Sequence, residues 1–274
     1  MAIVAAEHRR AALEVAHEIR QAFVRHRLLT YSSAISFRAL VALVPLTLLG
    51  LGLLGALGLS DVWTDSVAPA IQSHVTKPVF RGIDYSVKKI LSSDKGALIG
   101  LASALVLWHM SAAVATVAEA LNLIHDVKDE RPLWRKLAVV VALAVATILC
   151  LIGAVLVVSV FATVGSGAVH VVLGLGRWLV AALLLGLAIG LLVRYAPAEH
   201  PRPRWASAGS LAIVVAWIVL SLVFRLWVTY VSNFKTGIGV LTTFLVLGAY
   251  IYLSVLVFLG GVQLDEVLRK REEG

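Results

Sequence analysis

Long runs of apolar residues, separated by short polar segments, occupy most of this chain. An α-helix needs about 20 predominantly apolar residues to cross a bilayer, and six of the runs are long enough to do so. The predicted spans cover residues 34–59, 97–122, 136–164, 177–195, 206–231 and 240–264. The pattern therefore predicts an all-α, polytopic membrane protein with six transmembrane helices.

Two further segments have apolar positions at the spacing of an amphipathic helix. In residues 5–27, Arg and Glu occupy the opposite face, which predicts a helix on the cytoplasmic membrane surface or, alternatively, a plain solvated helix. In residues 60–96, Pro69 and Pro78 interrupt the stripe, which predicts one or two short helices on the outer membrane surface. The predicted organisation is a cytoplasmic N-terminal segment 1–33, a transmembrane domain 34–266 and a cytoplasmic tail 267–274.

The first span combines a proline with several glycines. Pro45 is expected to kink the helix, because proline has no backbone N–H to donate. Glycines in the outer half either let neighbouring helices approach closely or form a hinge, and both interpretations stay open. These glycines are Gly50, Gly52, Gly55 and Gly58. Residues 168–176, which are apolar but interrupted by glycine, either lie at the interface or form the first turns of the fourth span.

Composition and charge support a membrane location. The chain is 60% hydrophobic and 15% charged, with a mean hydropathy of +0.92, whereas soluble domains are about half apolar and about a quarter charged. The net charge is +8, and most Lys and Arg residues lie in the N-terminal segment, 123–136, 194–205 and the tail. Because cytoplasmic loops carry an excess of Lys and Arg, both termini are predicted to be cytoplasmic and to contact anionic lipids rather than nucleic acid. The single cysteine, Cys150, is predicted to be a core residue.

Polar side chains within the spans are the candidates for function, because such groups are costly in hydrocarbon. Arg38 and Glu119 lie near the cytoplasmic ends of the first and second spans, so matched depth predicts an ion pair. The alternative is that each side chain reaches separately to the interface. His109 lies about twelve residues, or roughly 18 Å, into the second span. It is either a neutral histidine bonded to a neighbouring helix or part of a proton relay.

Two more polar residues complete this set. Asn122 follows Glu119 at the end of the second span, just before a dense charged turn at 123–135. Arg225 lies in the outer third of the fifth span, which contains no carboxylate. It is expected to pair with an acid of the outer connection, to reach the interface, or to hold an anionic headgroup in a cavity. The candidate acids are Asp61, Asp65 and Asp84.

Motifs for catalysis are missing from the sequence. No two histidines have metal-ligand spacing such as H-x-H or H-E-x-x-H. There is no cysteine pair for zinc, no G-x-x-x-x-G-K-[ST] loop for a nucleotide and no G-x-S-x-G nucleophile motif. We therefore expect a protein that is not an enzyme and needs no metal or other cofactor.

Three stretches in the expected order resemble the YihY/BrkB family of bacterial inner-membrane proteins. They are Ala34–Leu46, then Ala120–Asn122 with Glu130–Arg135, and finally Tyr250–Leu264. The resemblance implies six spans with both termini in the cytoplasm of a bacterial cell. The family pattern often has a second aromatic residue where Arg38 stands and an acid where Gln263 stands. Its older label, ribonuclease BN, has no support in these residues, because clustered metal ligands are missing.

The sequence thus favours an inner-membrane transporter or flippase-like protein for an amphiphilic, anionic, lipid-like substrate. The first span, with Pro45, would move against the second, and the pathway or gate would involve polar side chains. These are Arg38, His109, Glu119, Asn122 and Arg225. The alternative is a non-transporting scaffold or membrane-integrity factor that uses 60–96 and the basic surfaces for docking. Membrane lipids and an amphiphilic small molecule are the expected partners.

Overall fold

The computed structural model describes residues 17–72, 77–92, 95–160, 168–198, 207–230 and 237–273. These residues are almost entirely helical and contain no β-strand. Residues 17–25 form the described part of a first helix. The elements that follow are α2 (Leu28–Ala56), a π-helical turn (Val62–Val67), α3 (Ala68–Gln72), α4 (Lys77–Ser92), α5 (Lys95–Ile124), α6 (Leu133–Val160), α7 (Ala168–Tyr195), α8 (Ala208–Tyr230) and α9 (Gly237–Glu273). Six of them are long and apolar enough to cross a membrane, which confirms the predicted fold class.

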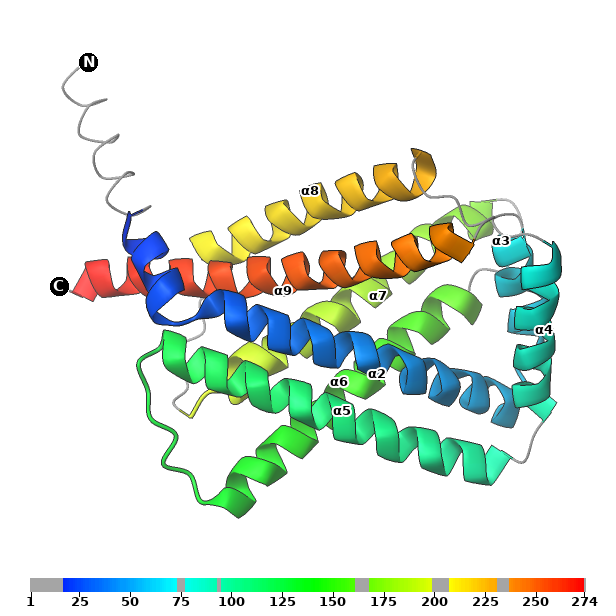
Figure 1. The fold of residues 1–274 in the computed structure, drawn as a ribbon, viewed down its shortest axis with the longest axis horizontal. Helices are drawn as coiled ribbons and strands as arrows, with labels where there is room; N and C mark the ends of the chain where they lie inside the picture. Colours follow the sequence, from blue (N-terminus) through cyan, green and yellow to red (C-terminus); the bar gives the residue numbers. More distant parts are fainter. Residues whose placement is uncertain are drawn as a thin grey trace.

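The long helices form a bundle in which α2, α5 and α9 lie side by side (Figure 1). α6 packs mainly on α7, and α8 packs chiefly on α9, at the edge of the bundle. The core lies where α2, α5, α6 and α9 meet. Its most buried side chains include Leu28, Val106, Leu121, Ile124 and Leu259. Burying these side chains against one another leaves α8 and much of α7 facing outward.

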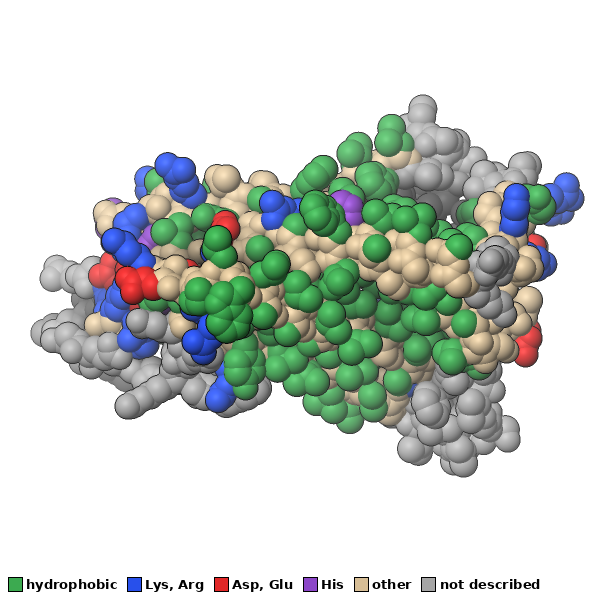
Figure 2. All heavy atoms as spheres, turned by 90° about the horizontal axis from the view of Figure 1, so that it is seen from below, with side chains coloured by type: hydrophobic (Ala, Val, Ile, Leu, Met, Phe, Trp, Pro, Cys, Tyr) green, Lys and Arg blue, Asp and Glu red, His purple; other side chains and the backbone are tan. Residues whose placement is uncertain are grey.

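The bundle has two polar ends. The first, called the terminal end here, holds residues 17–27, the turn after α5, the end of α7 and the end of α9 (Figure 1). The far end holds the π-helical turn, α3 and α4. On the face drawn in Figure 2, hydrophobic side chains form a broad band across the middle, with most charged side chains at the two ends. This is the surface that a bilayer-spanning bundle presents to lipid.

Some boundaries differ from those predicted. α2 begins at Leu28 rather than 34, directly after Arg27, whose φ of 50° breaks the preceding helix. α9 continues to Glu273, through residues that were predicted to form a tail. Ala168 starts α7, so the glycine-interrupted segment 168–176 forms the first turns of that helix.

The connection between α2 and α5 is helical, as predicted, in its described part. α4 lies across the far end of the bundle rather than along it (Figure 1). Its apolar side packs on Trp63 and Ala68 through Phe80, Ile83 and Val87. The indole N–H of Trp63 donates to Asp84 Oδ1 at 2.9 Å, and this bond ties the π-helical turn to α4.

The glycines of α2 support its packing. A Cβ at Gly52 would lie 2.9 Å from Ile99 of α5, and one at Gly55 would lie 3.1 Å from the Leu91 carbonyl oxygen of α4. Gly50 has open space around it, whereas Gly58 takes φ +71° just beyond the helix end. Two of the four glycines therefore allow close approach of neighbouring elements, which is the packing interpretation.

Candidate functional site

Arg38 reaches from α2 to α5 within the membrane-spanning part of the bundle. Its Nη1 donates to the Ala112 carbonyl oxygen and to Thr116 Oγ1. Thr116 is buried, whereas the Arg38 side chain is only partly buried. The guanidinium has five N–H donors, and it has no carboxylate partner among the described residues. Arg38 thus holds two helices together, and the structure shows no partner from the described residues for most of its donors.

The predicted ion pair between Arg38 and Glu119 is not formed in the structure. α2 and α5 run antiparallel, and Arg38 lies at the level of Ala112 and Thr116. Glu119 is one turn nearer the terminal end than Thr116, about 4.5 Å along the helix. Its side chain is exposed. The nearer hydroxyl and carbonyl oxygens therefore take the place that the carboxylate was expected to fill.

These residues nevertheless share a surface. His109, Thr116 and Glu119 are seven and three residues apart, so they lie on one side of α5, and Arg38 reaches that side from α2. We call these four residues the α2–α5 polar seam. His109 is half-buried and has no hydrogen-bond partner among the described residues, so the expected bond to a neighbouring helix is missing. The seam runs for roughly 15 Å, from near the terminal end to mid-bundle.

Pro45 and Asn122 lie away from the seam. Pro45 is buried inside α2, which stays one continuous helix from Leu28 to Ala56. Asn122 is buried, and its Oδ1 accepts the backbone N–H of Ala198 at 2.7 Å. Asn122 therefore fastens the end of α5 to the residues that follow α7, which is a structural role.

Arg225 lies on a separate surface, in α8. It is exposed and borders a shallow groove of about 440 Å³ together with Val214, Trp217, Ile218, Ser221 and Leu222. None of the acids predicted to pair with it does so. Asp84 instead binds Trp63 and Lys88 at the far end.

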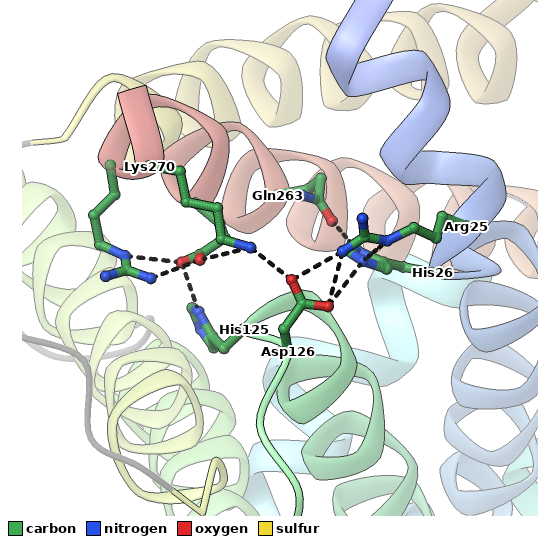
Figure 3. Close-up of polar contacts among 8 residues, drawn as sticks. Arg25, His26, His125, Asp126, Gln263 and Lys270 are labelled. Atoms are coloured by element: carbon green, nitrogen blue, oxygen red, sulfur yellow. Dashed lines mark hydrogen bonds and ion pairs between the residues drawn. The ribbon is translucent and has the colours of Figure 1, made fainter. Parts of the chain in front are cut away.

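The most densely connected polar group lies at the terminal end, where three parts of the chain meet (Figure 3). We call it the terminal cluster. It consists of Arg25, His26, His125, Asp126, Gln263, Glu266, Arg269 and Lys270. Asp126 lies between Arg25 Nη2, at 2.9 Å from both carboxylate oxygens, and Lys270 Nζ at 2.6 Å. The hydrogen bond from Lys270, aided by Arg25 and opposed by partial burial, lowers the pKa of Asp126 below its usual value.

Two histidines, one buried and one partly buried, extend this cluster. His26 is 3% exposed, and its Nδ1 lies 2.6 Å from Gln263 Oε1. His125 Nδ1 lies 2.9 Å from Glu266 Oε2, and Glu266 also accepts bonds from Arg269. His125 Nε2 is buried without a hydrogen-bond partner among the described residues. The cluster connects residues 17–27, the end of α5 and the end of α9.

Sequence reasoning missed this cluster because its members are distant along the chain. The signal was present in two places: His125-Asp126 just beyond the second span, and the polar exit of the last span after Gln263. Each looks like an ordinary charged boundary by itself. Among the described residues, no group of three or more His, Cys, Asp or Glu side chains is placed to hold a metal ion.

Comparison with known proteins gives a family over nearly the whole chain. The model of the family described as "Virulence factor BrkB" matches residues 19–274. The ribonuclease-like protein YfkH of Bacillus subtilis (strain 168) is 24% identical over 268 residues, which cover 93% of this chain and 95% of that protein. No solved structure matches the chain.

Proposed function

We propose that this chain, which belongs to the virulence factor BrkB family, moves an anionic, lipid-like amphiphile across the bacterial inner membrane. The observation that carries the proposal is Arg38, a cation inside a span. It has no carboxylate partner in the described part of the chain, and it lies on a partly exposed polar seam. In this proposal both termini are cytoplasmic, and the terminal end faces the cytoplasm.

The chemistry of the seam suits a lipid headgroup. An arginine fork binds phosphate and carboxylate oxygens well, because its planar donors match their geometry. Large apolar side chains beside the seam are exposed, among them Phe37 at 68% and Trp108 at 75%. A headgroup would follow the polar side chains while its acyl chains stayed among the apolar residues and the surrounding lipid. Glu119, at the cytoplasmic end of the seam, would repel free anions and favour headgroups that also carry a cation.

The α2–α5 polar seam extends from near the terminal end only to mid-bundle, so a pathway across the membrane needs another polar site in the far half. We assign the far half to the groove beside Arg225, which offers a second cation next to apolar residues. Movement of α2 against α5 would pass the headgroup between these two cationic positions. The chain is proposed to work without covalent catalysis, cofactor or nucleic acid, and ion gradients or partner proteins would drive any uphill step.

The test is translocation of fluorescent phospholipids in liposomes that contain the purified protein. Arg38→Gln should slow translocation at least several-fold if the headgroup uses the seam, and Glu119→Gln should slow it for headgroups that also carry a cation. Arg135→Gln is the matched control, because Arg135 is an exposed arginine outside the seam. Wild-type translocation no faster than in empty liposomes, with anionic and neutral lipids and with and without a pH gradient, would refute the proposal. The scaffold hypothesis would then take its place.

A further inference from the structure

Residues 17–27, called the arm here, are attached to the rest of the bundle by several polar contacts as well as by the packing of Phe23 on the core. The arm meets α9 through Glu18 and Arg271, at 2.7 Å, and through His26 and Gln263. It meets the end of α5 through Arg25 and Asp126. Among apolar contacts, Phe23 packs over Gly260. Ion pairs and hydrogen bonds of this kind weaken when one of their side chains gains or loses a proton.

The geometry fixes the protonation state of His26 in this attachment. The Nε–H of Arg25 donates to His26 Nε2 at 3.1 Å. An arginine nitrogen can only donate, so His26 Nε2 must carry a lone pair. The proton of the neutral ring is then on Nδ1, which donates to Gln263 Oε1. The attached arm therefore requires a neutral His26 with its proton on Nδ1.

We infer that His26 is a pH-sensitive switch: its protonation, when the terminal end is acidified, detaches the arm from α9 and α5. Protonation at Nε2 would set two donors against each other at 3.1 Å and place a second positive charge beside Arg25. The ring is buried, so water screens this repulsion poorly. Histidine is the side chain whose charge changes between about pH 5 and 8.

The other charged groups around His26 do not cancel this effect. Asp126 Oδ1 is 3.7 Å from His26 Nε2, but Asp126 is 43% exposed and already binds Arg25 and Lys270. Glu18 and Glu266 border the same cavity as His26, and they are bound by Arg271 and by His125 with Arg269, respectively. Each nearby carboxylate is therefore already bound to cationic or imidazole groups.

Protons can reach His26 from the surface. An open cavity of about 210 Å³ lies between the arm and α9 and is bordered by His26, Gln263 and Lys270. The partly buried His125 should respond in the opposite sense, because a protonated His125 would bind Glu266 more strongly. Acid should therefore loosen the arm and leave the contact between α5 and α9 intact. Arg27, in the left-handed region, is the joint about which the arm would turn.

Distances between spin labels would test the inference on the full-length protein in nanodiscs. Labels at Val24→Cys, which is 76% exposed, and Lys128→Cys would report the arm relative to the turn after α5, with Cys150 replaced by alanine. The distance distribution should shift to longer values between pH 7.5 and 5.5. His26→Gln should abolish the shift. The matched control His17→Gln, an exposed histidine on the same arm, should keep it.

Two further variants test the same inference even if His26→Gln does not fold. Arg25→Gln removes the opposing donor and should reduce the acid response although His26 is still present. His125→Gln should keep the response. The inference is wrong if the wild-type distribution is the same at both pH values, if His26→Gln still responds, or if His125→Gln alone abolishes the shift. None of these results depends on whether the protein transports lipid.

Discussion

Replacing Gly209 by alanine should separate α8 from α9. A Cβ at Gly209 would lie 2.2 Å from the Gly261 carbonyl oxygen and 2.5 Å from Asp265 Cγ, whereas ordinary contacts are 3.4–4 Å. The nearest obstacle is backbone, so a side-chain rotation cannot relieve the clash. The two helices would have to separate by about 1 Å at this crossing.

The expected loss of stability can be worked out from the contact and the hydrogen bond that this separation disturbs. Overpacking of a close contact costs about 1–3 kcal/mol. The Gly209 N–H donates to Asp265 Oδ1 at 2.7 Å, and a hydrogen bond to a charged group is worth about 1.5–3 kcal/mol. The higher helix propensity of alanine raises the free energy of unfolding by up to about 1 kcal/mol, which offsets part of this loss. We therefore expect Gly209→Ala to lower the free energy of unfolding by about 2–4 kcal/mol.

The assay is reversible unfolding in bicelles, with thermal stability in mild detergent as a second measurement. Gly186→Ala in α7 is the matched control, because a Cβ there would meet nothing within 4 Å. The control should be as stable as the wild type or slightly more stable. Equal stability of Gly209→Ala and Gly186→Ala would refute the close approach of α8 and α9 at this point.

Three other changes test separate parts of the structure. Asn122→Ala removes the buried side-chain oxygen that accepts the partly buried N–H of Ala198, so the free energy of unfolding should fall by about 1–3 kcal/mol in the same assay. The hydrogen bond from Arg131 lowers the pKa of Asp129, so its carboxylate stabilises the fold at neutral pH. The stability difference between wild type and Asp129→Asn should shrink as the pH falls below about 4. Gly55→Val should weaken the packing of α4 on α2 and speed protease cleavage in α4.

Each of these three predictions has a control or a result that would contradict it. Asn122→Asp keeps an acceptor oxygen and should be less destabilised than Asn122→Ala at neutral pH. A constant difference between wild type and Asp129→Asn from pH 7 to 3 would contradict the lowered pKa. Gly50→Val is the control for Gly55→Val, because Gly50 has open space around it. Equal cleavage of these two valine variants would argue against the predicted contact.

Run length and charge bias were enough to predict the spans, because hydrocarbon thickness sets helix length independently of tertiary contacts. The partner of Arg38 was predicted incorrectly because depth counted from a span end is uncertain by about one turn, the distance from Glu119 to Thr116. The His26–Gln263 bond joins residues 237 positions apart. Nothing local to either residue indicates the other, so only the packing of α9 beside α2 and α5 reveals it. The hydrogen bond between Asn122 and Ala198 likewise depends on helix packing, and the position of Asn122 near Glu119 did not suggest it.

The terminal cluster also affects how the protein can be synthesised. Its bonds join side chains of α9 to residues 17–27 and to the end of α5, as Gln263 does with His26 and Lys270 does with Asp126. These bonds can form only after α9 has been synthesised, although α2 and α5 can already pair in the bilayer. Closure of the terminal end therefore follows the synthesis of α9. A chain that stops before α9 would insert most of the helices described above and yet leave residues 17–27 without their partners on α9, which gives quality-control proteases a simple means of recognising it.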